Sequence, residues 1–319
     1  MKTTRGSGDL GFRVFTGAFA LLLLAIVTGI GVVLYHESVL SIHQFGFKFW
    51  VTDIWDPVSG EFGARPFIWG TLYSSLLALL VSAPISLGVA TYLSELCPPQ
   101  FRQPLIFLTE LLAAIPSIVY GIWGMFVLVP LVRRLELATP ESLRGFPLFS
   151  GPPIGLGMLS AALILAVMIT PFISSLAREV LKQVPRMQRE GAYALGATRW
   201  EAIRVALAYG RTGIVGAIML GLGRALGETM AVTMVIGNTP KIAASLFAPQ
   251  YTMSAVIANE FTEATGDLHR HALIEIGLVL FIITLVVNAL SRLLIWNMNR
   301  RTVAKGKPKA EPAVVGAPA

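Results

Sequence analysis

Residues 190–197 read EGAYALGA, and residues 223–228 read GRALGE within the apolar stretch that follows. The first run has the character of a loop, and we predict that it docks another protein. In the second run, Arg224 and Glu228 are four residues apart, which puts them on one face of a helix, one turn from each other. Charges are costly in a helix surrounded by hydrocarbon, so such a pair typically marks a pathway or an ion pair.

The composition predicts a membrane protein. Of the 319 residues, 55% are hydrophobic and only 13% are charged, and the mean hydropathy is +0.70. A membrane-spanning helix needs about 20 mainly apolar residues. Six stretches qualify, and together they predict an all-α membrane fold with six transmembrane helices: 12–35, 67–93, 104–132, 154–177, 212–237 and 271–296.

Charge sets the expected topology. The formal net charge of +7 could indicate that the protein binds nucleic acid, but the topology of a membrane protein explains this charge better. With the N-terminus inside, 17 of the 25 Lys and Arg residues lie on the inner side and seven on the outer side, with Arg224 inside a span. The positive-inside rule therefore predicts a multi-pass protein with both termini in the cytoplasm. The apolar stretch 18–34 could instead be a signal peptide, but no small-residue cleavage site precedes His36.

Three parts are expected along the chain. Residues 1–66 form a tail, the first helix and an aromatic outer segment, 36–66, that we expect to lie along the membrane surface, with contact to an external partner as the alternative. Residues 67–297 form the membrane domain. Residues 298–319 are a basic, disordered tail.

The inner loop 178–211 carries seven basic and three acidic residues. Its apolar positions recur with helical spacing on both sides of Gly196. We expect two short helices joined at that glycine, because glycine tolerates a sharp turn. The 28 positions from Gly196 to Arg224 would cover at most roughly 40 Å, which predicts that Arg224 lies well inside the bilayer.

A further acid, Glu110, lies in the third predicted span, before Pro116, a residue expected to kink that helix. Two interpretations of Glu110 remain open. Its carboxylate could line a pathway, or it could reach the inner membrane surface, because the helix begins only six residues earlier, at Pro104.

Several classes of chemistry are excluded. No glycine-rich phosphate loop is present, since the one Gly-Lys pair, at Gly306, precedes a proline. Any nucleotide that drives transport must bind another polypeptide. Cys97 is the only cysteine, and the four histidines lack metal-ligand spacing, so we expect neither a disulfide nor a metal site nor a cofactor. No catalytic set can be assembled, which argues against an enzyme.

Arg224 and Glu228 allow two interpretations. In the first, they line a translocation pathway: the planar guanidinium matches an oxyanion, and Glu228 partly neutralises it when no substrate is there. In the second, they form a structural pair that fixes helix packing.

Residues 190–197 resemble the coupling loop, or EAA motif, of binding-protein-dependent ABC importers. The residues that carry the resemblance, and the ATPase contact it implies, are Glu190, Gly191, Ala192, Leu195, Gly196 and Ala197. The sequence departs from the motif at Gly191, where alanine is preferred, and at 208–209, where a proline is usual.

Three further stretches resemble PstC-type permeases of phosphate importers: WDP at 55–57, ELLAAIPSIVYG at 110–121 and GRALGETMAV at 223–232. The resemblance implies a MetI-like permease core with phosphate as substrate. It also implies four partners: a PstA-type second permease, two ATPase copies and an external phosphate-binding protein.

The expected function is therefore ATP-driven phosphate import by alternating access. Arg224, Glu228 and Glu110 are the candidate pathway residues. Two rivals remain: an ion-coupled secondary transporter using Glu228 and Glu110, and a permease for another oxyanion such as molybdate or sulfate.

Overall fold

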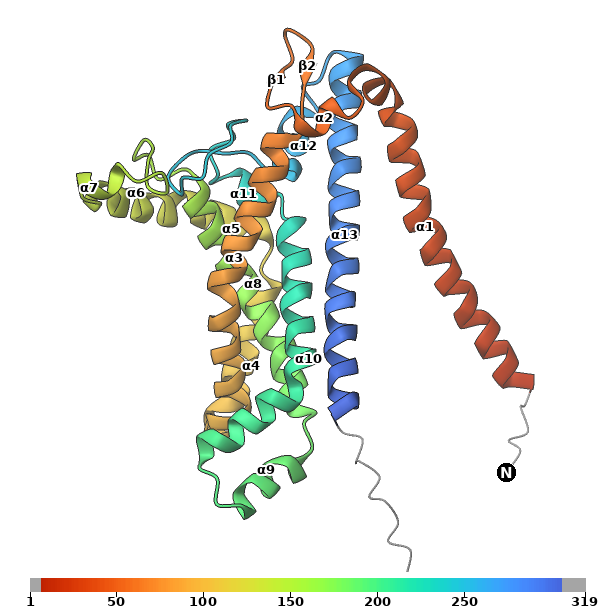
Figure 1. Cartoon of the computed structure of the whole chain (residues 1–319), viewed down its shortest axis with the longest axis vertical. Coiled ribbons are helices and arrows are strands. Elements are labelled where there is room, and N and C mark those ends of the chain that lie inside the picture. Colours follow the sequence, from red (N-terminus) through yellow and green to blue (C-terminus); the bar gives the residue numbers. More distant parts are fainter. Residues whose placement is uncertain (1–6, 306–319) are drawn as a thin grey trace, which may run out of the picture. The chain divides into compact units, whose positions relative to one another are not determined.

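The computed structural model describes residues 7–305, with side chains from residue 11 to residue 298. Figure 1 shows the helices and the small hairpin in chain order. The elements are α1 (Ser7–Phe45), α2 (Lys48–Val51), β1 (Trp55–Asp56), β2 (Glu61–Phe62), α3 (Arg65–Thr91), the π-helix η1 (Tyr92–Leu96), α4 (Pro99–Ala114), α5 (Ser117–Trp123), the π-helix η2 (Gly124–Leu128), α6 (Val129–Ala138), α7 (Glu141–Arg144), α8 (Met158–Lys182), α9 (Arg186–Ala194), α10 (Arg199–Leu226), α11 (Met230–Thr233), α12 (Met253–Glu260) and α13 (Asp267–Lys305).

Six helical segments in the described residues are long and apolar enough to cross a membrane, which confirms the predicted six-helix, all-α membrane fold. They are Gly11–Phe45, Arg65–Leu96, Ser117–Ala138, Met158–Lys182, Arg199–Leu226 and Asp267–Met298. The described strands are β1 and β2, which pair in an antiparallel hairpin. At its turn, hydrogen bonds from the Ser59 side chain and the Val58 N–H hold the pKa of Asp56 below its ordinary value.

The third span differs from its prediction of 104–132. Helix α4 ends at Ala114, and α5 begins at Ser117, after Pro116 in an extended conformation. Proline has no N–H to donate and disfavours helical backbone in the residue before it. The helix therefore stops there rather than kinking, and the span begins at Ser117, so Glu110 falls on the separate helix α4.

The fifth span is also different from its prediction of 212–237. Helix α10 starts at Arg199 and ends at Leu226, so Arg224 lies in its last turn. The predicted span thus runs past the true helix end, where Gly227 follows. At the other end of the chain, α13 continues to Lys305, whereas the tail was predicted from residue 298. The predicted tail beyond residue 305 and the first six residues lie outside the described residues.

The chain forms two compact units. The first contains the residues up to Ala78, together with Ile115–Ala166 and Ala225–Thr284. The second contains Leu79–Ala114, Val167–Arg224 and the residues from Leu285 onward. The helices α3, α8, α10 and α13 contribute a segment to each unit.

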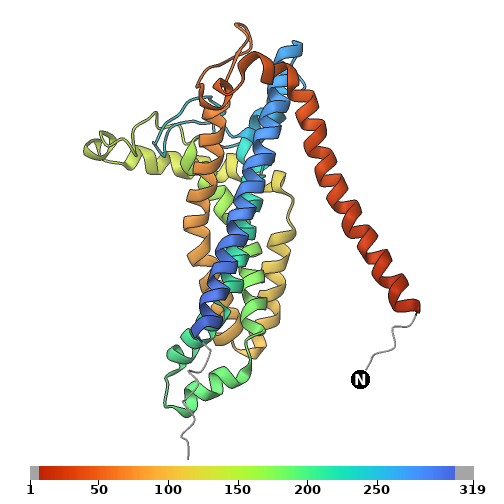
Figure 2. The ribbon, with the colours of Figure 1, turned by 45° about the vertical axis from the view of Figure 1, so that its right-hand side comes forward.

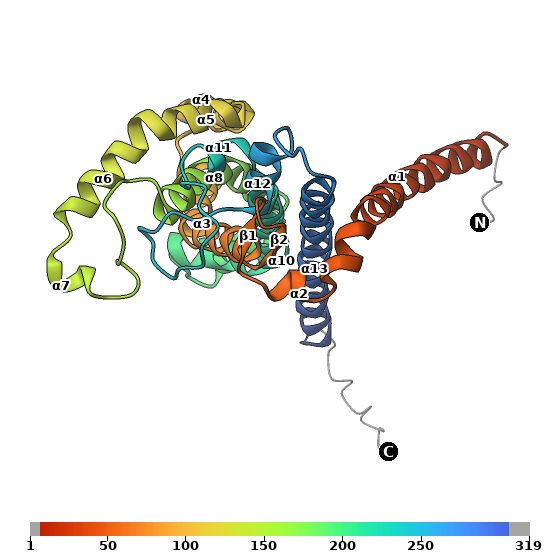
Figure 3. The same cartoon turned by 90° about the horizontal axis from the view of Figure 1, so that it is seen from above.

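The first unit has an aromatic core. Phe49, Phe62 and Phe67 are fully or almost fully buried there, among residues of α12 and α13. The Trp55 ring packs edge-on against Phe62 and Phe67, with ring centroids 4.8 and 4.9 Å apart. Figure 3 shows β1, β2 and α12 together near the start of α3. Phe49 and Phe62 of segment 36–66 thus pack inside the protein, where this core removes their rings from water, and the position of the segment along the membrane surface stays a prediction.

In the second unit, α3, α8 and α10 meet in an apolar cluster that includes Ala90, Leu181 and Ala217. Ser86 on α3 donates a hydrogen bond to the Thr170 carbonyl oxygen of α8, at 3.1 Å. Gly213 and Gly221 let α10 approach α8 closely, since a Cβ at either position would meet Val180 or Ile173. Small residues thus set the spacing of these helices.

A loop of the first unit docks on α3 through a glycine and a threonine. A Cβ at Gly70 would clash with the Tyr251 carbonyl oxygen. The next residue, Thr71, accepts a hydrogen bond from the Met253 N–H at 2.9 Å. These two contacts fix the loop that leads into α12.

We predict that Gly70→Ala destabilises the protein by about 1–3 kcal/mol, because the added methyl group meets backbone that cannot rotate away. The matched control is Gly88→Ala in the same helix, where a Cβ meets nothing within 4 Å. Alanine should be neutral or stabilising there, by about 0.5–1 kcal/mol. Thermal unfolding of the two purified variants measures the difference, and equal melting temperatures would contradict the docking.

Candidate functional site

The predicted coupling residues form a helical elbow in the second unit. The chain leaves α8 at Lys182, forms the short helix α9 and then enters α10, as Figure 2 shows. Pro185 precedes the first residue of α9, and Thr198 precedes the first residue of α10. The two predicted short helices are therefore α9 and the first turns of the long helix α10.

Gly196 ends α9 by a specific backbone geometry. Its φ is +82°, in the left-handed region that favours glycine. Its N–H donates to the Tyr193 carbonyl oxygen at 2.9 Å, and the Ala197 N–H donates to the Ala192 carbonyl oxygen at 3.0 Å. This pair of bonds is a Schellman motif, which satisfies carbonyl groups at the helix end. Gly196 thus shapes the elbow.

The start of α10 is capped by Thr198 and Glu201. The Glu201 carboxylate accepts hydrogen bonds from the Thr198 N–H at 2.7 Å and from the Thr198 hydroxyl at 2.8 Å. In return, the Thr198 hydroxyl accepts from the Glu201 N–H at 3.4 Å. This capping box explains why α10 begins well before the apolar stretch, in a polar segment.

The elbow exposes apolar side chains. Leu195 is 91% exposed and Met187 is 78% exposed, and Tyr193 and Trp200 are about half exposed. Glu190 is also exposed, and a Cβ at Gly191 would meet nothing within 4 Å. Apolar side chains so exposed on a short helix are typical of a surface that another protein covers.

An ion pair that the sequence analysis missed ties the elbow to η1. The Arg189 guanidinium donates to both oxygens of Glu95, at 2.5 and 3.1 Å, and both side chains are mostly buried. Arg189 also donates to the carbonyl oxygens of Leu181 and Val184, at the end of α8. Arg199 donates to the Glu95 carbonyl oxygen at 2.8 Å. One acid thus connects α9 and the start of α10 to η1.

Glu110 has a basic partner. Its carboxylate lies 3.4 Å from the Arg178 guanidinium of α8, which also contacts Glu179 at 2.8 Å. The Glu110 side chain is about half exposed. Glu110 is thus held by a basic partner, and its position in a pathway stays a prediction.

Arg224 lies exposed in the last turn of α10. Its guanidinium stands 5.4 Å from the centroid of the Phe172 ring on α8, a cation–π distance. A positive charge there also interacts favourably with the carbonyl groups at the helix end. The stacking holds one face of the guanidinium against the ring.

Glu228 lies in the break between α10 and α11, so it does not share a helix face with Arg224 as predicted. Its carboxylate accepts a hydrogen bond from the Ala231 N–H at 3.2 Å, and its carbonyl oxygen accepts one from the Ser254 hydroxyl at 2.7 Å. The prediction assumed that the helix continued. The glycine at 227 was the available signal that it ends.

Four residues that make these ion pairs and the cation–π contact were not singled out from the sequence: Glu95, Arg189, Arg178 and Phe172. Glu95 could have been noticed as an acid at the end of an apolar span. Its partner lies 94 positions away, and helical spacing cannot predict such a pairing.

The chain is similar to known membrane permeases. Residues 85–303 match the family described as binding-protein-dependent transport system inner membrane component. The phosphate transport system permease protein PstC of Mesorhizobium japonicum is 46% identical over 302 residues, covering 93% of this chain and 92% of the relative. The PstC protein of Haemophilus influenzae is 47% identical, with 93% and 95% covered.

A solved structure has a similar fold. A chain of the methionine ABC transporter MetNI, in an inward-facing conformation, aligns with a TM-score of 0.55 and 18% identity, covering 72% of this chain and 94% of that one. Together with the matches over nearly the whole sequence, this leads to one conclusion. The chain belongs to the binding-protein-dependent transport system inner membrane components and, within that family, to the PstC-type permeases.

Proposed function

We propose that the chain is one of two permease subunits of an ATP-driven importer of inorganic phosphate. The relatives that match over nine-tenths of the chain are named as phosphate permeases. The single observation that carries the mechanism is α10, one unbroken helix that begins at the elbow and has Arg224 in its last turn. The 25 steps from Arg199 to Arg224 would cover at most roughly 38 Å at 1.5 Å per residue, because α10 bends after its first turns, as Figure 1 shows.

The proposed partners are two ATPase copies, a PstA-type permease and an external phosphate-binding protein. The exposed side chains of the elbow, Met187 and Leu195 above all, would fit an apolar cleft of an ATPase. ATP hydrolysis would take place on that partner, because this sequence has no phosphate-binding loop. The elbow and both termini would then be cytoplasmic, in a bacterial inner membrane, as the distribution of basic residues favours.

We propose Arg224 and Glu228 as the pathway residues of this subunit. A planar guanidinium offers several N–H donors to the oxygens of one phosphate. Stacking on the Phe172 ring would keep the Arg224 guanidinium in one orientation. The N–H groups at the edge of the guanidinium would stay available to phosphate. A break in a membrane helix, such as the one at 227–229, is also typical of transporter substrate sites. Glu110 is left out of this proposed contact because its carboxylate faces Arg178.

The proposed mechanism is alternating access. ATP binding brings the two ATPase copies together, and each carries along the elbow it holds. The backbone of α10 is helical from Arg199 to Leu226 but bends sharply after its first turns, as Figure 1 shows, and we propose that this bent helix passes the movement on to Arg224. The external binding protein delivers phosphate in one state, and the site opens inward in the other.

Arg224→Gln and Arg224→Lys test the substrate contact. Both should lower phosphate uptake into vesicles at least about tenfold, because glutamine loses the charge and lysine loses the planar fork. The complex should still assemble, and its ATPase should still respond to the binding protein. Wild-type uptake in either variant would rule out the contact. Loss of assembly in both would indicate a structural role instead.

Gly196→Ala and Gly191→Ala form a matched pair that tests the elbow. Alanine at 196 must adopt a left-handed backbone, which costs about 1–2 kcal/mol and should weaken ATPase co-purification. Alanine at 191 meets open space and should strengthen α9 by about 0.5–1 kcal/mol without loss of binding. Equal co-purification of the ATPase by the two variants would contradict this account of the elbow.

Exchanging the two charges tests the ion pair between Glu95 and Arg189. Arg189→Ala should reduce ATPase association and destabilise the protein by about 2 kcal/mol, because Glu95 is left mostly buried without its partner. The double variant Glu95→Arg with Arg189→Glu should recover part of the association. If the swap behaves no better than Arg189→Ala, the ion pair itself does not position α9.

A further inference from the structure

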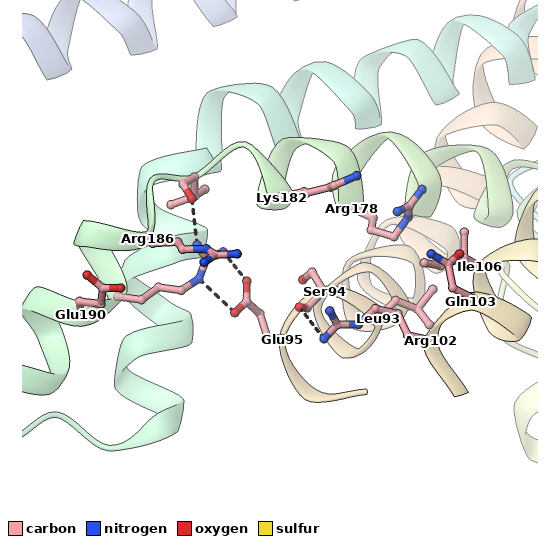
Figure 4. A pocket seen from close by; sticks show the side chains of 12 residues that line it. Leu93, Ser94, Glu95, Arg102, Gln103, Ile106, Arg178, Lys182, Arg186 and Glu190 are labelled. Atoms are coloured by element: carbon pink, nitrogen blue, oxygen red, sulfur yellow. Dashed lines mark hydrogen bonds and ion pairs between the residues drawn. The ribbon is translucent and has the colours of Figure 1, made fainter. Parts of the chain in front are cut away.

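A cavity of about 570 Å³ lies beside the elbow, and neither Arg224 nor Glu228 lines it. Four elements of the second unit line it: η1, α4, α8 and α9. Its volume falls in the range of roughly 300–1,000 Å³ that ligand pockets occupy. Figure 4 shows the side chains that surround it.

Basic side chains are the largest group among the twelve residues that line the cavity. Five of its residues are Lys or Arg: Arg102, Arg178, Lys182, Arg186 and Arg189. Two acids, Glu95 and Glu190, line the cavity, and Arg178 also pairs with Glu110 and Glu179 beside it. These acids leave Arg102, Lys182 and Arg186 without an ion pair in residues 11–298. Glu95 is already held by both bonds from Arg189. In Figure 4, Glu190 lies at the far end of the cavity from Arg102 and Arg178.

Several of these donors are unused. Within residues 11–298, Lys182 and Arg186 make no hydrogen bond or ion pair. Arg102 donates to the carbonyl oxygens of Ser94 and Cys97 through one nitrogen, but its Nε is buried without a partner. A buried donor left unsatisfied costs about 1–3 kcal/mol. An anion in the cavity would partly neutralise the positive charges of Arg102, Lys182 and Arg186.

The donor set indicates the class of anion. Guanidinium groups match the tetrahedral oxygens of a phosphate group, and lysine adds a point charge. Basic pockets between membrane helices on the cytoplasmic side commonly hold lipid phosphates. A lipid headgroup and free phosphate share this chemistry.

We propose that this cavity is a second anion site that binds a phosphate group, supplied either by an anionic lipid headgroup or by free phosphate. The site uses other residues than the proposed contact at Arg224, and it does not depend on the proposed transport function. An anion bound there would contact α4, α8 and the elbow helix α9, and would add to the ion pair between Glu95 and Arg189.

The test compares ligand binding by the purified complex and by a variant, Lys182→Gln with Arg186→Gln, using native mass spectrometry. These two side chains make no contacts that hold the fold, so the variant should assemble normally. One arm titrates phosphatidylglycerol into complex prepared in phosphatidylcholine. The other arm titrates inorganic phosphate. In at least one arm, the variant should bind roughly tenfold more weakly, because it loses two cationic contacts.

Two controls make the result specific. Arg204→Gln with Arg292→Gln removes the same charge from exposed positions outside the cavity and should bind like the wild type. Lys182→Arg with Arg186→Lys keeps the charge and should retain binding. Both arms are repeated with Arg224→Gln, so that loss of binding at the proposed pathway is distinguished from loss of binding at the cavity.

The outcomes decide between the sources. If the variant loses binding only in the lipid arm, the natural ligand is a lipid headgroup. If it loses binding only in the phosphate arm, the ligand is free phosphate. Loss of binding in both arms means that the two ligands share the site. Unchanged binding in both arms overturns the proposal. An equal loss in the Arg204 and Arg292 control also overturns it, because general surface charge would then be the cause.

Discussion

Backbone hydrogen bonding is the constraint on which the rest of this structure depends. In hydrocarbon, every N–H and carbonyl group must find a partner within the protein, so a membrane helix can break only where other groups replace the lost bonds. Helix α10 has no such place between Arg199 and Leu226 and stays continuous. The break that follows is supported by Glu228, whose carboxylate receives the Ala231 N–H and whose carbonyl oxygen receives the Ser254 hydroxyl.

This continuity gives the elbow and Arg224 a physical connection. The elbow is held at its own end by a mostly buried ion pair, by a Schellman motif and by a capping box. None of these contacts is to a substrate. They fix the angle at which α9 joins α10, and a force on α9 would therefore act on the long helix as a whole.

Much of the fold could be predicted from the sequence. The length of the apolar stretches was enough to predict six spans, and the helices on either side of Gly196 were predicted from the spacing of their apolar residues. Helix ends were predicted less well. Pro116 stops a helix that was expected only to kink, and Gly227 ends one that was expected to continue. Hydropathy does not detect such ends, because the residues on both sides are equally apolar.

The candidate site was predictable where the signal was local. Arg224 was noticed as a charge in an apolar run, but its contact with Phe172 joins two helices and depends on their packing. The same holds for Glu95 with Arg189 and for Glu110 with Arg178. The aromatic residues of 36–66 were expected at the membrane surface, yet Phe49 and Phe62 pack in a core whose other residues come from distant parts of the chain.

The central claim is that the elbow and α10 move as one rigid body. Spin labels at Gln188 on α9 and at Leu220 on α10, both exposed, would measure it by pulsed electron resonance in the complete complex, after the buried Cys97 is replaced by serine. The account predicts the same narrow distance distribution without nucleotide and with the ATPase trapped in its ATP-bound state. A shift or a clear broadening between the two states would show that α10 bends or separates from the elbow, and would contradict the account.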